Sequence, residues 1–269
     1  MLDKRILSSA VIIPVCLLAV FAGGWFFLML VSLILAVAAW ELARMFRQGG
    51  FSPSEFILVG GSILLAVARY FTNIDITSLI FTALVLLSMA FHTIAYERGV
   101  DSAGVDFCLT TGGLAYVGWL GSHLVSLRML AEGTYWIILA IVSVSMADVG
   151  AYLIGMVLGR HKISRRVSPN KSVEGYLGGI LMAVLFAYLF SMAIQPYSEN
   201  INPINGVVLG LILSLVSPLG DLGESMLKRH FKLKDSSQLI PGHGGFLDRI
   251  DTWIWAAAVG YYLIIYLWI

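Results

Sequence analysis

Acidic and basic side chains recur at helical spacing where a long apolar segment ends. The residues at i, i+3, i+4 and i+7 of this stretch share one helical face; they are Asp221, Glu224, Ser225 and Lys228. Carboxylates near the end of a membrane helix are costly to bury unless a cation compensates them. This face is therefore a candidate metal site, although an ordinary i,i+4 contact with Lys228 is the alternative for Glu224.

A glycine-rich segment, residues 234–251, follows this face. Pro241 and the glycines after it prevent a continuous helix. Glycines lack a Cβ, so the backbone N–H groups can approach an anion closely, and the helix that follows directs its positive end to the same place. Asp248 and Asp251 lie in that opening turn, where a carboxylate can bind metal or cap the helix. We favour metal binding for Asp248 and leave both roles open for Asp251.

A second basic segment covers residues 160–174. It carries five cations, which are Arg160, Lys162, Arg165, Arg166 and Lys171. Their charge is equally compatible with substrate phosphates and with anionic lipid head groups, which contribute about 1 kcal/mol per cation. Asp148 lies upstream in an apolar segment, with Tyr152 one turn later. A carboxylate inside the membrane is a functional candidate, and a salt bridge to a neighbouring helix is its alternative.

The elements that carry these residues are apolar helices. Hydrophobic residues make up 59% of the 269 residues and charged residues 12%, against roughly 45–50% and 25% in soluble domains. Runs without Asp, Glu, Lys or Arg cover residues 6–40, 76–96, 107–127, 175–198, 200–220 and 252–269. The first run is long enough for two crossings, divided at Gly23 and Gly24, and weaker candidates lie at 56–71 and 134–159. Because open strand edges cannot face lipid, we predict an all-α, polytopic transmembrane bundle of about nine spans.

The basic residues predict how the chain is oriented. With nine crossings, all of the 17 Lys and Arg residues except Arg69 and Arg128 lie on the side of the N-terminus. The positive-inside rule places that side in the cytoplasm, as in a bacterial-type inner membrane. We expect a scaffold of transmembrane helices at 1–132 and a catalytic region at 133–269, with cytoplasmic loops at 160–174 and 228–251. Cys16 and Cys108 indicate neither a disulfide framework nor a thiolate metal site.

Three stretches together resemble a known family. The first is Ser225-Met226-Leu227-Lys228-Arg229, then Lys234-Asp235, then residues 239–251, which read LIPGHGGFLDRID. The second is Ala147-Asp148 with Ala151-Tyr152 and Gly159-Arg160-His161-Lys162, and the third is residues 168–179, SPNKSVEGYLGG. They are similar to the motifs of phosphatidate cytidylyltransferases, also called CDP-diacylglycerol synthases, and cover the chain from about residue 147 to residue 251.

The resemblance implies a magnesium-dependent nucleotidyl transfer, in which a phosphate oxygen of phosphatidic acid attacks the α-phosphorus of CTP and pyrophosphate leaves. Oxygen ligands suit Mg²⁺ rather than zinc, and a second cation is possible. The implied metal ligands are Asp221 and Asp248, supported by Asp148 and Glu224. The implied catalytic residues are Asp221, Asp248, Lys228 and Arg229. The implied substrate-binding residues are Ser168, Lys171, Glu174, His243, Gly244, Gly245 and Arg249.

Two other functions could use some of the same residues. A CTP-dependent polyprenol or phytol kinase would use similar nucleotide machinery but pass on the γ-phosphate. A transporter would line its pathway with Asp148, Asp221 and Glu224, yet it leaves the glycine-rich segment unexplained, and no repeated halves are evident. His243 can serve as a base, a phosphate donor or a turn residue. We expect contact with membrane lipids and no nucleic-acid partner, and we consider a homodimer because two-fold assemblies are common.

Overall fold

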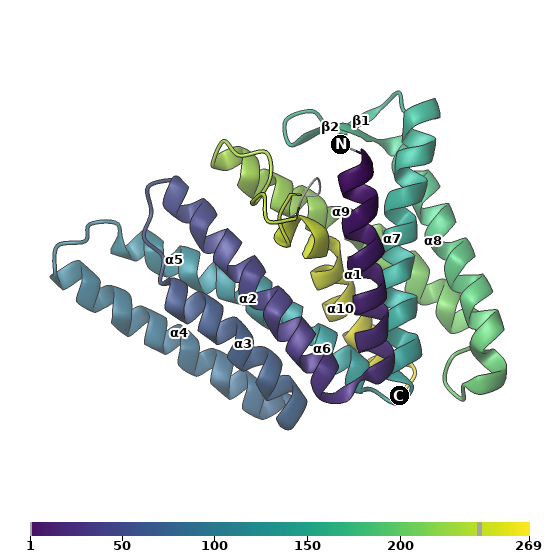
Figure 1. Cartoon of the computed structure of the whole chain (residues 1–269), viewed down its shortest axis with the longest axis horizontal. Coiled ribbons are helices and arrows are strands. Elements are labelled where there is room, and N and C mark those ends of the chain that lie inside the picture. Colours follow the sequence, from purple (N-terminus) through teal and green to yellow (C-terminus); the bar gives the residue numbers. More distant parts are fainter. Residues whose placement is uncertain (1, 241–243) are drawn as a thin grey trace. The chain divides into compact units, whose positions relative to one another are not determined.

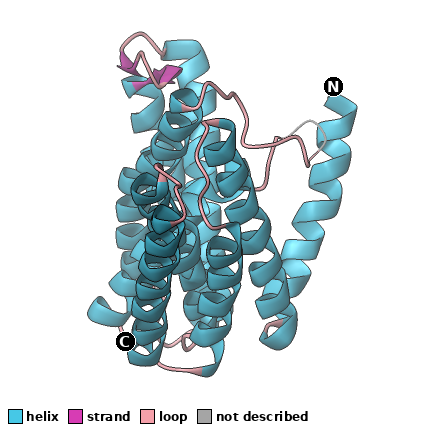
Figure 2. Ribbon diagram, turned by 90° about the vertical axis from the view of Figure 1, so that its left-hand side faces the viewer, coloured by secondary structure: helices cyan, strands magenta, loops and turns pink. Residues whose placement is uncertain are grey.

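The protein is almost entirely helical in the computed structural model, which describes residues 2–240 and 244–269 (Figure 1). The helices are α1 (Leu2–Ala22), α2 (Gly24–Gln48), α3 (Glu55–Phe71), α4 (Ile74–Glu97), α5 (Ala103–Gly113), η1 (Leu114–Leu120), α6 (Gly121–Met129), α7 (Gly133–Leu158), α8 (Val173–Ile194), η2 (Gln195–Tyr197), α9 (Pro203–His230) and α10 (Leu247–Leu267). Two short strands, β1 (Lys162–Ser164) and β2 (Ser168–Ser172), pair antiparallel in one hairpin, shown in magenta in Figure 2. The predicted all-α, polytopic membrane fold is confirmed.

Six helices in the described part of the chain are long and apolar enough to cross a membrane, namely α2, α4, α7, α8, α9 and α10. The other predicted crossings are also helical but shorter or interrupted. α3 has 17 residues, α1 contributes an apolar stretch at Ile12–Ala22, and a π-helical turn, η1, separates α5 from α6. The count of nine spans therefore stays a prediction.

The predicted division of the first apolar run is confirmed. α1 ends at Ala22 and α2 begins at Gly24. Gly23 and Gly24 have φ angles of 61° and 51°, a left-handed conformation that costs glycine little because it has no Cβ. Two adjacent glycines thus separate two apolar helices without a polar loop.

The chain forms two compact units, and each combines segments that are distant in the sequence. The first contains Met1–Ser126 and Lys228–Ile250, and the second contains Leu127–Leu227 and Asp251–Ile269. In the first unit α2 packs on α3, and α3 packs on α4 and η1. The glycine-rich segment predicted to work with the C-terminal helices therefore belongs to the same unit as the N-terminal helices.

Close approach of α7 and α8 organises the second unit. A Cβ on Gly150 of α7 would lie 2.6 Å from the Met182 side chain and 2.8 Å from the backbone oxygen of Gly178 on α8. Likewise, a Cβ on Gly179 would lie 2.5 Å from the backbone oxygen of Ala147. Small residues at such interfaces let membrane helices approach until their backbones are in contact. This pairing places the end of α7 against the start of α8, where polar residues gather.

Substitution of Gly150 by alanine is expected to destabilise the second unit. The added methyl group meets backbone that cannot move without separating the helices, so we expect a loss of about 1–3 kcal/mol. Thermal unfolding of the purified protein in detergent measures this loss. Gly60→Ala on α3 is the matched control, because a Cβ there has no neighbour within 4 Å among the described residues. Equal unfolding temperatures for the two variants would contradict the close packing of α7 and α8.

Candidate active site

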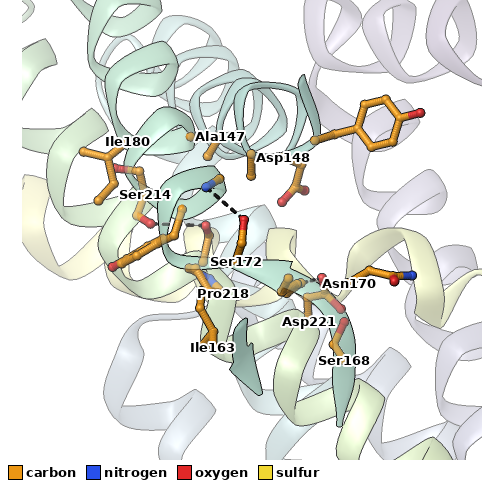
Figure 3. A pocket seen from close by; sticks show the side chains of 17 residues that line it. Ala147, Asp148, Ile163, Ser168, Asn170, Ser172, Ile180, Ser214, Pro218 and Asp221 are labelled. Atoms are coloured by element: carbon orange, nitrogen blue, oxygen red, sulfur yellow. Dashed lines mark hydrogen bonds and ion pairs between the residues drawn. The ribbon is translucent and has the colours of Figure 1, made fainter. Parts of the chain in front are cut away.

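A cavity of about 340 Å³ opens in the second unit between α7, the hairpin, α8 and α9. Figure 3 shows Asp148 of α7 and Asp221 of α9 among its lining residues, together with Ser168 and Asn170 of the hairpin. Its volume is within the range of small-molecule sites. Three stretches of sequence that are separated along the chain therefore contribute polar groups to one cavity.

Local sequence explains how the walls of this cavity form. Ser172 ends β2 and caps α8, since its hydroxyl accepts a hydrogen bond from the Gly175 N–H at 3.2 Å. On the opposite wall Pro218 lies inside α9, where it has no N–H to donate to the Ser214 carbonyl. Ser214 and Ser217, which are 1% and 2% exposed, line the cavity beside this proline. The walls thus present hydroxyl groups and a helix N-terminus to a ligand.

Two carboxylates and one cation meet in the cavity. Lys171 of the hairpin forms an ion pair with Asp221, and the Ser225 hydroxyl donates to Asp221 at 3.2 Å. Asp148 lines the same cavity as this ion pair. Asp148, Lys171 and Asp221, three of the predicted site residues, therefore line one cavity. The arrangement offers both a site for a cation and a positive side chain for an anion.

Glu174, in the first turn of α8, anchors the hairpin. Its carboxylate accepts hydrogen bonds from the Arg160 N–H at 3.0 Å and from the His161 N–H at 3.2 Å. The His161 ring also contacts it through Nδ1. Glu174, which was predicted to bind substrate, contacts the backbone at the base of the basic hairpin that carries Ser168 and Lys171. Its role in substrate binding stays a prediction.

Two further predicted site residues, Lys228 and Asp248, lie in the first unit. Lys228, at the end of α9, donates to Asp248 Oδ1 at 2.5 Å, and their side chains are 11% and 7% exposed. Asp248 Oδ2 accepts from the Ser236 N–H, the Ser236 hydroxyl and the Gly245 N–H at 2.8–2.9 Å. Three of these donors converge on Oδ2, and the Lys228 ammonium balances the negative charge at Oδ1. Asp248 is therefore already stabilised by neighbouring donors and a cation of its own unit.

The other predicted residues occupy different surroundings. Arg229 is exposed and donates to the Leu233 carbonyl at 3.0 Å, and Arg249 is exposed in the first turn of α10. Glu224 is buried on α9. Gly244 has a φ of 82°, and a Cβ there would lie 2.8 Å from Asp248 Oδ2. His243 lies outside the described residues.

Asp221 belongs to the second unit and Asp248 to the first. Their convergence on a single nucleotide stays a prediction. Asp251, for which capping and function were both open, accepts a hydrogen bond from the Thr252 N–H at 2.7 Å.

Sequence analysis missed Glu41, a residue of α2 that is 0% exposed. Its carboxylate accepts hydrogen bonds from the glycine-rich segment almost 200 residues later. A signal was present, because Glu41 directly follows the charge-free run 6–40 inside a helix long enough to span the membrane. The rule applied to Asp148, that a carboxylate within a membrane helix is a functional candidate, applies equally to Glu41.

The residues present fit magnesium better than zinc. Within residues 2–240 and 244–269, no three His, Cys, Asp or Glu side chains group closely enough to form a metal cage. Mg²⁺ is commonly held by one or two carboxylates, with water and substrate phosphates completing its coordination. Asp148 and Asp221 in one cavity provide such a pair of oxygen ligands.

Comparison with known proteins identifies the family of this chain. Residues 3–267 match the cytidylyltransferase family. A phosphatidate cytidylyltransferase of Synechocystis sp. is 33% identical over 292 residues, covering 98% of this chain and 97% of that protein. Enzymes of the same name from Staphylococcus saprophyticus and Staphylococcus aureus are 33% and 32% identical, over 91% and 93% of this chain and 93% and 94% of their own lengths.

Fold and site together define a membrane-embedded nucleotidyltransferase. The chain belongs to the cytidylyltransferase family, and the resemblance to phosphatidate cytidylyltransferases drawn from its motifs is confirmed.

Loss of the Glu174 charge is expected to loosen the hairpin. The neutral amide of Glu174→Gln accepts more weakly from the Arg160 and His161 N–H groups than the carboxylate does, so we expect this variant to open its hairpin several times more often than the wild type. Arg165 and Arg166 are exposed in its turn, and trypsin cleavage at these positions in the detergent-purified protein reports the opening. Glu97→Gln, at the exposed end of α4, is the control. Cleavage of Glu174→Gln at the wild-type rate would show that Glu174 does not hold the hairpin.

Proposed function

We propose that this protein transfers the cytidylyl group of CTP to phosphatidic acid, giving CDP-diacylglycerol and pyrophosphate. The observation that carries the proposal is the cavity in which Asp148, Asp221 and Lys171 meet at the N-terminus of α8. Membership of the cytidylyltransferase family and three relatives named phosphatidate cytidylyltransferase support it. A site for a nucleoside triphosphate needs both cation ligands and positive groups, and this cavity has both.

Binding of the triphosphate is assigned to the hairpin, α8 and the residues at the end of α9. Lys171 is paired with Asp221, so an entering phosphate can take over the ammonium group while Asp221 becomes available to a cation. Backbone N–H groups at the start of α8 favour negative charge because the helix dipole is positive there. Lys228, Arg229 and Arg249 complete the proposed set of phosphate-binding cations.

Mg²⁺ is the proposed cofactor, held by Asp221 and Asp148, with Asp248 and Glu224 as further candidates and a second cation possible. When bound, it would neutralise triphosphate charge and make the α-phosphorus more electrophilic. Asp221 and Asp148 supply the oxygen atoms that such an ion prefers. Because Asp248 is paired with Lys228, we propose that these two residues balance charge at the phosphates.

The attacking group needs little activation. A phosphate monoester has a second pKa of about 6 and is largely dianionic at neutral pH, so no strong general base is required. The obstacle is repulsion between the lipid phosphate and the triphosphate. The proposed cations, which are Lys171, Lys228, Arg229 and Arg249, reduce this repulsion. They also stabilise the charge that develops on pyrophosphate as the bond between the α-phosphorus and its bridging oxygen breaks.

Orientation follows from the distribution of positive charge. Four basic residues on or beside the hairpin are exposed, namely Arg160, Lys162, Arg165 and Arg166. The positive-inside rule favours the cytoplasmic face for this hairpin and for the N-terminus. In a bacterial-type inner membrane this is the side on which water-soluble CTP is available. A homodimer stays a hypothesis.

Labelled CTP tests the reaction directly. With phosphatidic acid and Mg²⁺ we expect the label of [α-³²P]CTP to appear in lipid and the label of [γ-³²P]CTP to appear in pyrophosphate, because the bond between the α- and β-phosphates is the one that breaks. An excess of chelator should abolish turnover, and added Mg²⁺ should restore it. Transfer of the γ-label to lipid would instead identify a lipid kinase, and undiminished turnover in chelator would remove Mg²⁺ from the proposal.

Substitution of Asp221 by asparagine is expected to lower kcat at least about 100-fold, the cost of removing one group that stabilises charge in the transition state. The fold should be retained, because the side chain is about one-third exposed at 32%. Steady-state rates on folded, purified protein measure the loss. Asp75→Asn, an exposed carboxylate at the start of α4, is the control and should keep the wild-type rate. A rate within about threefold of wild type for Asp221→Asn would remove this residue from the site.

A further inference from the structure

Glu41 is a buried carboxylate that directly follows the apolar part of α2, with Arg44 and Arg47 later in the same helix. It is 0% exposed on α2, whose most apolar window has a mean hydropathy of 2.3. A charged group at such a position is expensive unless hydrogen bonds replace its hydration. The identity of its donors therefore shows which part of the protein benefits from its charge.

All of the donors described here come from the two ends of one loop. The Ser237 hydroxyl donates to Glu41 at 2.5 Å, and the Ser236 hydroxyl, whose single hydrogen is shared with Asp248, lies 3.1 Å from Glu41. The N–H groups of Phe246 and Leu247 donate at 3.0 and 2.8 Å. One carboxylate thus ties together the start and the end of the glycine-rich segment.

At the end of the loop Glu41 acts as a helix cap supplied by a distant element. Leu247 is the first residue of α10, and the first N–H groups of a helix have no partner within the helix. A negative charge at this end also interacts favourably with the helix dipole. Glu41 thereby fixes where α10 begins, one residue before Asp248.

Ser236 connects Glu41 to Asp248. Its hydroxyl oxygen lies 3.1 Å from Glu41 Oε2 and 2.8 Å from Asp248 Oδ2, and its backbone N–H donates to the same Asp248 oxygen at 2.9 Å. At Gly245, a Cβ would lie 2.6 Å from both Glu41 carboxylate oxygens and 2.0 Å from the Ser236 hydroxyl. Only glycine therefore allows Glu41 and Ser236 to approach the backbone whose N–H donates to Asp248.

We propose that Glu41 is a positioning residue for cytidylyl transfer, which holds both ends of the glycine-rich loop so that Ser236 and Gly245 orient Asp248 toward Lys228. The inference rests on the proposed role of Asp248 and Lys228 at the phosphates. Glu41 itself touches the loop, and its effect on the reaction passes through Ser236 and Gly245. An N-terminal helix with no recognised motif would then control the geometry of the C-terminal signature.

The test is a double-mutant cycle on Glu41→Gln and Ser236→Ala, with kcat measured per folded protein. A displacement of about 1 Å at a reacting group can cost about 100-fold in rate, so we expect Glu41→Gln to lower kcat by about that factor. Because part of the effect of Glu41 on Asp248 passes through Ser236, adding Ser236→Ala to Glu41→Gln should lower kcat by a smaller factor than Ser236→Ala does in the wild-type protein. Glu55→Gln, on α3 of the same unit, is the matched control and should keep the wild-type kcat.

A merely structural role makes different predictions. It would reduce the amount of folded protein while leaving kcat per folded molecule unchanged. Independent action would instead make the loss of kcat in the double variant equal to the product of the losses in the two single variants. Either result overturns the proposal, as does a kcat for Glu41→Gln within about threefold of wild type. Hydrogen–deuterium exchange adds a readout without turnover, since Glu41→Gln should speed exchange in peptides covering residues 236–247 while α4 peptides are unchanged. Unchanged exchange in both regions also overturns it.

Ser237→Ala keeps the proposal testable if Glu41→Gln does not fold. The Ser237 hydroxyl donates to Glu41 and accepts from the Leu239 N–H, whereas Asp248 receives its hydroxyl donor from Ser236. We expect Ser237→Ala to lower kcat about tenfold, in line with the loss of one hydrogen bond to a charged group. A wild-type rate for Ser237→Ala would sink the proposal. An inactive wild-type enzyme would instead refute the proposed function, and full activity of Asp248→Asn would refute the role of Asp248.

Discussion

Negative charge inside an apolar helical protein is tolerated only where donors or cations surround it, and this constraint shapes both units. Glu41 and Asp248 each lie among donors of the first unit, and Asp221 of the second unit is paired with Lys171. Each contact offsets the cost of removing a carboxylate from water. The same contacts bring together segments that are far apart in the sequence. Within each unit, buried carboxylates therefore connect segments that are distant in the sequence.

The two carboxylate environments differ in a way that suits different tasks. Asp221 is about one-third exposed in an open cavity and has one cation partner that a ligand can replace. Asp248 is 7% exposed and receives donors from two backbone N–H groups, one hydroxyl and Lys228. An open carboxylate can exchange its partner for a bound cation, whereas an enclosed one holds its neighbours in place. The sequence motif contains both residues and does not distinguish their surroundings.

Hydropathy predicted the helices correctly, whereas the number of membrane crossings stays a prediction. Apolar runs without charges favour helices, since a helix satisfies its backbone N–H and C=O groups internally and open strand edges cannot face lipid. The division at Gly23 was predicted because the first run is too long for one crossing. The length of each helix depends on where neighbours interrupt it. α3 is 17 residues long, and η1 divides the segment from Ala103 to Met129. Such interruptions arise from packing, to which a count of apolar residues is insensitive.

Residue types and spacing alone determined the helical membrane fold, the family, and the concentration of chemical groups between about 147 and 251, because these depend on local composition and on short motifs. Tertiary structure decided which groups meet. It paired Asp221 with Lys171 around one cavity, gave Glu174 the role of holding the hairpin, and joined Glu41 to a loop almost 200 residues later. A hydrogen bond depends on distance in space, and helix packing sets that distance without leaving any regular spacing in the sequence.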